Sequence, residues 1–167
     1  MKHCIGLFGT CGSSKWREKF INRYKTKSIS YFNPQKDNWK PEDAVIESEH
    51  LLSDDIVLFP ITSETFGTAS LAETGYSIIN AIKSNENRYV IIFIDKKLNP
   101  LLHLENPTAA KESTNSRTIV LEHLKKLNNK NIFVVDSLET MLELSIKLYK
   151  VYETMMKIRK DYDTIKT

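Results

Sequence analysis

The sequence predicts a single α/β domain in which five parallel strands form one sheet with helices on both faces. Two features of the hydropathy pattern support this prediction. Short apolar runs alternate along the chain with longer amphipathic stretches, as they do in β-α-β units. The runs are apolar throughout rather than at every second position, which is typical of strands buried on both faces of a parallel sheet.

The expected strands are residues 4–9, 28–32, 55–60, 88–94 and 131–135. The expected helices are residues 14–24, a helix from about 41, residues 70–83, residues 117–127 and residues 136–159. The last helix begins with Asp136, followed three positions later by Glu139, which is the pattern of a capping box. Five strands alternating with five helices most simply give a doubly wound, flavodoxin-like sheet of order 2-1-3-4-5.

One segment, residues 96–116, interrupts this alternation. It contains two prolines and a polar tract at residues 111–116, and it is too long for a tight connection. A long segment without regular structure in a compact domain is typical of a functional lid or a mobile excursion, so we expect these residues to be mobile or to act as a lid near the ligand site. The single domain is expected to span residues 1–160, and residues 161–167 are expected to form a frayed tail.

The composition is that of an ordinary globular protein, with 41% hydrophobic and 27% charged residues in 167. The net charge of +3 is small, and the basic residues are interleaved with acidic ones, which argues against a nucleic-acid partner. No apolar run approaches the ~20 residues that a membrane span needs, and no leader pattern opens the chain. We therefore expect a cytoplasmic protein with neither a nucleic-acid nor a membrane partner.

The cysteines and histidines predict neither a disulfide framework nor a metal site. Cys4 and Cys11 form no C-x-x-C pair, and the four histidines show no metal-ligand spacing. The chain also lacks a P-loop and the glycine fingerprint of dinucleotide-binding folds. We expect no cofactor.

In a sheet of this order, ligands bind at the carboxyl ends of the strands beside the switch point, here the first and third strands. This rule selects three loops, at residues 9–14, 33–40 and 61–70. The first loop reads Gly9-Thr10-Cys11-Gly12-Ser13-Ser14 and leads into a helix N-terminus, where free backbone amides favour an anion or a sugar oxygen. The alternative is that Ser13 or Ser14 only caps that helix.

The second loop places Trp39 among Asn33, Asp37 and Asn38. An aromatic face beside hydrogen-bonding groups is what a nucleobase requires, although Trp39 packing against the following helix is an alternative. The third loop leads into Ser70-Leu71-Ala72-Glu73. Glu73 is either the third position of a capping box begun by Ser70, or a nucleophile that the helix dipole keeps ionised at the switch point.

Several motifs occur together in a distinctive order. They are Leu7-Phe8-Gly9-Thr10-Cys11-Gly12-Ser13-Ser14-Lys15-Trp16-Arg17, then Tyr31-Phe32-Asn33-Pro34 with Asp37 and Trp39, then Glu47 and Glu49 ahead of Asp54-Asp55, and Gly67 with Ser70-Leu71-Ala72-Glu73. Together they resemble the nucleoside 2-deoxyribosyltransferase-like family over roughly residues 4–95.

The resemblance implies a small-molecule nucleoside or nucleotide as substrate and cleavage of its N-glycosidic bond. Glu73 would attack the anomeric carbon, and Glu47 would assist by protonating the leaving base or binding the sugar. Trp39 and Asn38 would hold the base, and the loop at residues 9–14 would lie at the sugar edge. Transfer of the (deoxy)ribosyl group to another base or to water is left open. The alternative function is a catalytically silent nucleotide-binding or sensing module.

The chain departs from the classical transferases at two positions, which points to a divergent branch. Ala69 stands where they have a glycine four residues before the nucleophile, and Gly67 stands where they have an aspartate near the leaving base. Related nucleotide N-glycosidases hold a 5′-phosphate with serines and backbone amides. Ser13, Ser14 and Ser70 are candidates for that role.

The last predicted helix carries more apolar and aromatic positions than one sheet-facing stripe needs. Members of the resembled family also assemble into oligomers. Both observations predict a homo-oligomer.

Overall fold

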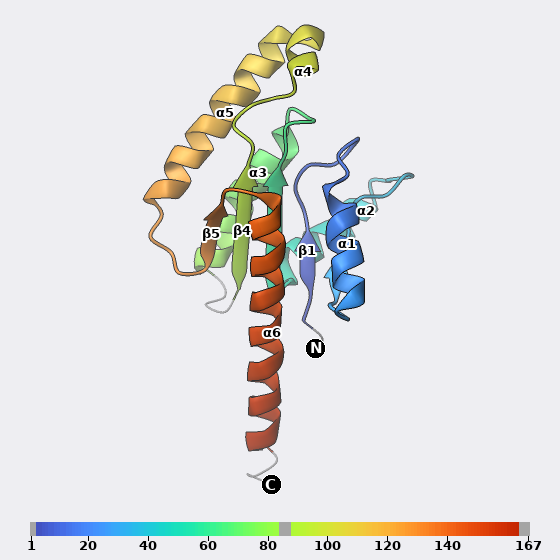
Figure 1. Cartoon of the computed structure of the whole chain (residues 1–167), viewed down its shortest axis with the longest axis vertical. Coiled ribbons are helices and arrows are strands. Elements are labelled where there is room, and N and C mark those ends of the chain that lie inside the picture. The colour runs from blue at the N-terminus through green and yellow to red at the C-terminus, as the bar shows by residue number, and fades with distance from the viewer. Residues whose placement is uncertain (1–2, 84–87, 164–167) are drawn as a thin grey trace.

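The computed structural model describes residues 3–83 and 88–163 of the chain. Figure 1 shows strands and helices alternating from the N-terminus to the long final helix. The elements are β1 (Ile5–Leu7), α1 (Trp16–Thr26), β2 (Tyr31–Phe32), α2 (Asp43–Ser53), β3 (Ile56–Ile61), α3 (Thr68–Lys83), β4 (Tyr89–Ile94), α4 (Pro100–Glu105), α5 (Pro107–Lys126), β5 (Ile132–Val135) and α6 (Leu138–Asp163).

The five strands form one parallel sheet in the order β2-β1-β3-β4-β5, which confirms the predicted fold class and topology. Ile5 of β1 pairs with Tyr31 of β2 on one side and with Ile56 of β3 on the other. The chain therefore adds β2 on one side of β1 and then adds β3 and the later strands on the other side, which makes the gap between β1 and β3 the switch point. The loops that follow these two strands diverge at that point and leave room for a ligand.

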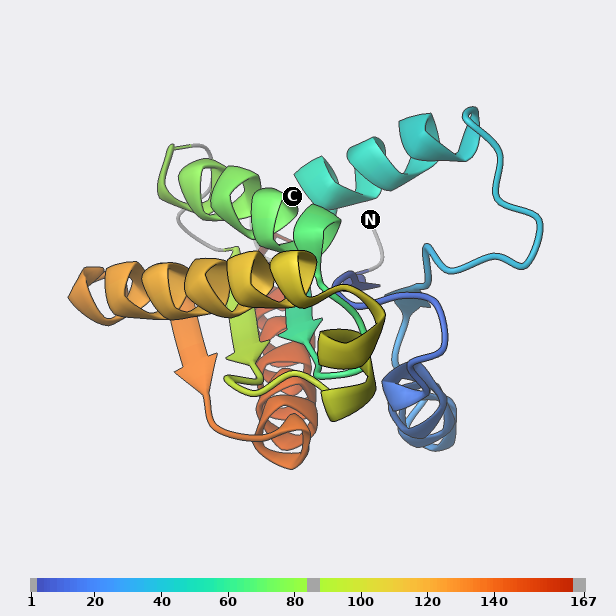
Figure 2. The ribbon, with the colours of Figure 1, turned by 90° about the horizontal axis from the view of Figure 1, so that it is seen from above.

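Helices cover both faces of the sheet because successive strand residues point to opposite sides. Seen from above, α1 and α6 lie on one face, and α2, α3 and α5 lie on the other (Figure 2). In β3, Ile56 and Leu58 pack toward α1 and α6, whereas Val57, Phe59 and Ile61 pack toward α2, α3 and α5. This two-sided burial explains why the strands are apolar throughout.

The expectation of a structureless segment at residues 96–116 is wrong, because that segment contains α4 and the first half of α5. Each helix begins with an Asn-Pro pair. The side chains of Asn99 and Asn106 accept hydrogen bonds from the amides of Leu101 and Ala109, both at 3.0 Å. The following prolines fill the first helical positions, where their missing N–H costs no hydrogen bond. Here the prolines start helices rather than interrupt them.

Two expectations for the final helix need correction. Ser137, not Asp136, caps it, since the Ser137 hydroxyl accepts a hydrogen bond from the Thr140 amide at 3.1 Å. Glu139 instead pairs with Lys19 of α1. The helix also continues to Asp163, so residues 161–163 of the expected tail are helical, and residues 164–167 lie outside the described residues. Neither α6 nor any other helix in the described ranges is long and apolar enough to cross a membrane.

Candidate active site

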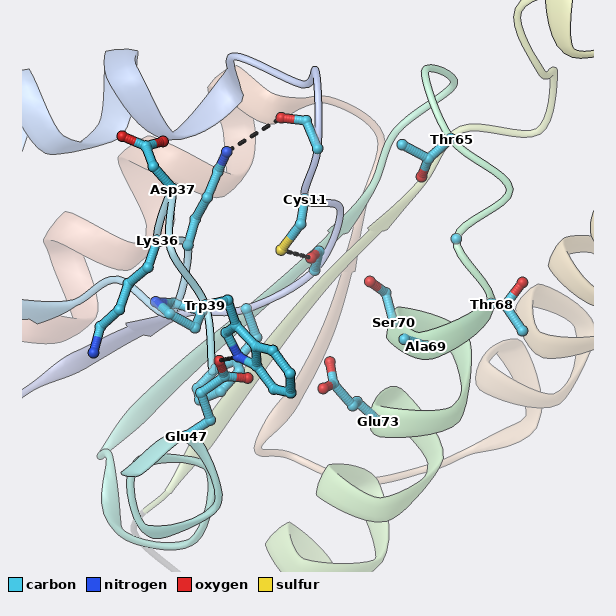
Figure 3. A pocket seen from close by; sticks show the side chains of 16 residues that line it. Cys11, Lys36, Asp37, Trp39, Glu47, Thr65, Thr68, Ala69, Ser70 and Glu73 are labelled. Carbon is cyan, nitrogen blue, oxygen red and sulfur yellow. Dashed lines mark hydrogen bonds between the residues drawn. The ribbon is translucent and has the colours of Figure 1, made fainter. Parts of the chain in front are cut away.

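A cavity of about 730 Å³ opens at the carboxyl ends of β1 and β3, where the three predicted loops meet. Figure 3 shows side chains from these loops and from α2 and α3 directed into it. Eight of the predicted site residues line the cavity: Gly9, Cys11, Asp37, Trp39, Glu47, Gly67, Ser70 and Glu73. Five others do not: Thr10, Ser13, Ser14, Asn33 and Asn38.

Glu73 enters the cavity from α3, and its side chain points across the cavity toward Trp39 and Glu47 (Figure 3). The capping-box alternative for this residue is wrong. Helix α3 begins at Thr68, and the Leu71 amide donates to the carbonyl of Gly67, so Ser70 already lies inside the helix. Among the described residues, no hydrogen bond fixes the Glu73 carboxylate, which therefore has no capping role.

The environment of Glu73 disfavours its charged form. Burial raises the pKa of the Glu73 carboxyl above its ordinary value, and repulsion from Glu47 raises it further. The positive charge of Arg17 offsets part of this rise. Glu73 lies in the second turn of α3, beyond the first turn where the expected stabilisation by the helix dipole acts.

Glu47 lies on α2 and faces the cavity beside Trp39. The indole Nε1 of Trp39 donates a hydrogen bond of 2.7 Å to Oε1 of Glu47. This bond ties Trp39 to the helix that follows it, as the structural alternative expected. It does not bury the ring, however, since 51% of Trp39 remains exposed. An aromatic face and a carboxylate oxygen thus lie together at the rim of the cavity.

In the loop after β2, some residues line the cavity and others stabilise the loop. Asp37 lines the cavity, whereas the side chain of Asn33 accepts a hydrogen bond from the Gln35 amide at 3.2 Å and so shapes the turn. Asn38 is exposed and lies outside the lining. Lys36 lines the cavity edge, but its amine pairs with Asp43 at 2.6 Å.

In the loop after β1, the backbone and Cys11 face the cavity, while the hydroxyl groups mostly serve the fold. The hydroxyl of Thr10 accepts a bond from the Thr62 amide at 2.9 Å, and the Ser14 hydroxyl is bonded to that of Thr62 at 3.2 Å. Neither Ser13 nor Ser14 caps α1, because the cap position is Lys15 and it makes no side-chain cap bond. Ser14 is buried against Thr62, and Ser13 is exposed but lies outside the lining of the cavity.

Sequence reasoning assigned no role to Arg17, although it organises this loop. Its buried guanidinium donates to the carbonyl oxygens of Leu7 at 3.0 Å, Gly9 at 3.2 Å and Thr10 at 2.5 Å. It also donates to the side chain of Gln35 at 3.2 Å, which links the first and second loops. Burial lowers the pKa of Arg17, whereas Cys11 and Glu73 act to raise it. The sequence does hint at the burial of Arg17, because this arginine follows Trp16 on the helix face that carries Phe20.

A second buried arginine, Arg117 of α5, organises the loop after β3 in the same way. It donates to the carbonyl oxygens of Ile61 at 3.0 Å, Thr62 at 3.0 Å and Thr65 at 2.8 Å. Gly67, predicted to bind substrate, has a φ of +68°, and a Cβ there would come within 2.8 Å of Ile61. Its lack of a side chain is thus required by the loop that begins α3.

The sequence analysis also missed several residues of the cavity lining. These residues are Phe8, Gly12, Pro34, Gln35, Lys36, Thr65, Thr68 and Ala69. Most of them lie within the three loops selected above. The sequence therefore predicted which loops form the cavity but not which of their side chains point into it.

Residues 2–93 match the profile of the family described as nucleoside 2-deoxyribosyltransferase like. No curated protein matches the chain. A solved structure described as a conserved protein from Enterococcus faecalis V583 has 14% sequence identity and a TM-score of 0.48, over 86% of this chain and 96% of that chain. The family profile covers more than half of the sequence, including every residue that lines the cavity. The chain therefore belongs to the nucleoside 2-deoxyribosyltransferase-like family.

Proposed function

We propose that this protein cleaves the N-glycosidic bond of a nucleoside or nucleotide, with Glu73 as nucleophile and Glu47 as its assistant. The observation that carries the proposal is the meeting of two carboxyl groups from different helices, α2 and α3, in one cavity beside an exposed indole ring. Glu73 makes no hydrogen bond within the described chain that would explain its burial. A partly buried, unbonded carboxyl group facing a cavity is the arrangement of a reactive group.

The reaction would proceed in two displacements at the anomeric carbon. The Glu73 carboxylate attacks this carbon, the C–N bond breaks, and its electron pair leaves with the base. The base takes up a proton, which Glu47 would supply or relay. A second base or water then attacks the same carbon and gives its proton to Glu47, and the ester C–O bond breaks to restore the Glu73 carboxylate.

The remaining residues of the cavity suit the parts of such a substrate. The exposed face of Trp39 offers a surface for stacking the base, with Asp37 nearby for hydrogen bonding. Ser70 lies one turn before Glu73 on α3, so a sugar attacked by Glu73 would pass close to its hydroxyl. Gly9 and Cys11 bring the first loop to the opposite side, where its backbone can contact the sugar.

The charges around the cavity favour a nucleoside over a 5′-nucleotide. Asp37, Glu47 and Glu73 place three carboxyl groups on the lining. Lys36, the basic residue among the described residues of the lining, is paired with Asp43, and Figure 3 shows its amine directed away from Glu73. A phosphate would therefore meet like charge without a free cation to offset it.

The test is base release, followed by chromatography, from matched nucleosides and their 5′-monophosphates. We expect wild-type protein to prefer the nucleosides, and Glu73→Gln to lose nearly all turnover because an amide cannot form the sugar ester. Glu47→Gln should be slower by up to the ~10²–10⁴-fold that general acid catalysis contributes. Glu49→Gln is the matched control, since Glu49 is exposed on α2 outside the cavity, and it should behave as wild type.

Two results would reject the proposal. Turnover by Glu73→Gln at the wild-type rate would show that Glu73 is not the nucleophile. Saturable nucleoside binding by the wild type, without base release from any member of the panel or transfer to an added base, would establish the silent binding module instead.

A further inference from the structure

A second cluster of chemically versatile side chains lies at the amino-terminal edge of the sheet, opposite the cavity. Cys4 directly precedes β1, Asp54 follows α2 and precedes β3, and His50 lies in the last turn of α2. Their ligand atoms all lie within 4.8 Å of one another. The sheet explains this meeting, because β1 and β3 are neighbours in register from Ile5 and Ile56 onward.

The carboxylate of Asp54 is only partly satisfied within the described chain. The residue is 3% exposed, and its Oδ1 is 2.9 Å from Nδ1 of His50. Its Oδ2 is buried and has no hydrogen-bond partner among the described residues. A buried carboxylate oxygen without a partner is costly, and a cation is one group that removes this cost.

The imidazole of His50 is held in place by Phe32 of β2. The two rings stack with centroids 3.6 Å apart and planes 4° from parallel. This stacking keeps Nδ1 turned toward Asp54, while about a third of the His50 side chain stays open to solvent. The cluster is therefore both preorganised and reachable from outside.

We propose that Cys4, His50 and Asp54 bind a zinc ion. Sulfur, imidazole nitrogen and carboxylate oxygen are the three donor types that zinc takes from proteins. On binding, the Cys4 thiol loses its proton to solvent and its sulfur bonds to the metal, and His50 coordinates through Nδ1 with its proton on Nε2. The thiolate and the Asp54 carboxylate together carry the two negative charges that offset Zn²⁺, and water completes the tetrahedral set.

The cluster is flanked by charged side chains that are not ligands. These are Asp55, which is 2.9 Å from Nδ1 of His3, and Arg88, whose guanidinium donates to the carbonyl of Leu51. Arg88 acts on Asp54 electrostatically and reduces the site's affinity for a cation without contributing a ligand.

The ion would have a structural role, because it would join the residue before β1 to the end of α2 at the edge remote from Glu73. We therefore expect zinc to raise the melting temperature, since a ligand that binds only the folded state stabilises it. Zinc should leave the rate of base release unchanged. This separates the zinc proposal from the proposed glycosidic function, which can fail without affecting it.

The test is titration of the full-length, chelator-treated protein with Co²⁺ and then Zn²⁺. We expect one equivalent of cobalt to give a thiolate-to-cobalt charge-transfer band with the visible spectrum of a tetrahedral site, and zinc to displace it. Cys4→Ser should lose the charge-transfer band. His50→Phe keeps a ring against Phe32 but removes the ligand nitrogen, and it should weaken zinc binding by more than the roughly 10- to 100-fold that loss of an outer-shell partner costs.

Cys11→Ser is the matched control, because it removes the other cysteine of the chain and should leave the spectrum unchanged. Circular dichroism of each variant without metal checks that it is folded. Absence of a charge-transfer band in the wild type would overturn the proposal. So would loss of the band in Cys11→Ser, or wild-type zinc affinity in a folded His50→Phe variant.

Discussion

The carboxyl group of Glu73 is subject to opposing influences in the free protein. Burial and Glu47 disfavour its charge, while Arg17, buried behind the first loop, favours it. A carboxyl group whose pKa rises on folding costs stability above that raised pKa and costs none below its ordinary pKa. Replacing Glu73 with Gln should therefore preserve the fold and increase stability at neutral pH. Loss of turnover in that variant would then reflect chemistry.

The raised pKa of Glu73 also predicts the pH dependence of the reaction. In the proposed mechanism only the carboxylate attacks, so kcat/KM should fall as the pH drops through a pKa above the ordinary value of 4.5. Glu47→Gln removes one cause of the rise, so the acid limb of its residual activity should move to lower pH. The measurement is kcat/KM against pH for both proteins. An acid limb at or below 4.5 in the wild type would contradict this account of the Glu73 environment.

At this scale the sequence identified the residue types of the site better than their orientations. Glu73, Glu47 and Trp39 line the cavity as predicted, because Glu73 and Glu47 lie on the regular helices α3 and α2 and Trp39 is bonded to Glu47. Thr10 and Ser14 lie outside the cavity lining because the irregular loop turns their hydroxyl groups inward, where both bond to Thr62. No local pattern reveals such a partner, since Thr62 is far away in the sequence.

At the scale of elements, two helices support the cavity from behind through buried arginines. Arg17 of α1 holds the loop after β1, and Arg117 of α5 holds the loop after β3 that leads into α3. Each guanidinium donates to several backbone carbonyl oxygens, which only the planar fork of arginine can do from one position. Glu73 therefore owes its position partly to α5, a helix that does not line the cavity.

Arg117→Lys should impair catalysis although it keeps the positive charge. An ammonium group cannot replace the bonds to Ile61, Thr62 and Thr65, so the start of α3 should shift. A displacement of about 1 Å in a catalytic group costs up to ~10²-fold, and we expect a loss in kcat of that order. Arg23→Lys, at an exposed position on α1, is the control. Equal kcat values for Arg117→Lys and wild type would show that these bonds do not position Glu73.

The helices also show where hydropathy patterns are insufficient. The polar stretch before Arg117 has no clear apolar stripe, yet it is helical from Pro107 onward. The helix is set by its cap, Asn106, and by contacts such as that of the Ser113 hydroxyl with the carbonyl of Phe66 at 2.6 Å. The Asn-Pro pairs could have indicated these helix starts, but such a pair is as common in a turn as at the start of a helix.

At the scale of the whole molecule, the topology was the most predictable feature. Five apolar runs and right-handed crossovers leave few ways to build a parallel sheet, and the observed order is the simplest of them. The extent of α6 was less predictable. It is 26 residues long and extends well beyond the sheet toward the C-terminus (Figure 1). Every residue of it from Glu153 to Tyr162 is exposed.

The extension of α6 supports the expectation of a homo-oligomer. It carries exposed apolar and aromatic side chains: Val151 (54%), Met155 (46%), Met156 (39%), Ile158 (45%) and Tyr162 (66%). Such a surface on a projecting helix is typical of an interface. Light scattering at micromolar concentration should give at least twice the chain mass of 19.3 kDa. Val151→Glu combined with Met155→Glu should reduce the mass to that of one chain. A wild-type mass of 19.3 kDa would rule the oligomer out.

If Glu73 is the nucleophile, it forms a covalent bond to the sugar, and the mass of the quenched protein reveals that bond. Wild-type protein is mixed with a nucleoside that it turns over, acid-quenched within one turnover, and digested for peptide mapping. We expect a mass increase of one pentosyl or deoxypentosyl group on the peptide that contains Glu73, and no such increase in Glu73→Gln. Addition of the group to another residue, or base release without an adduct and at an equal rate in Glu73→Gln, would contradict this role of Glu73.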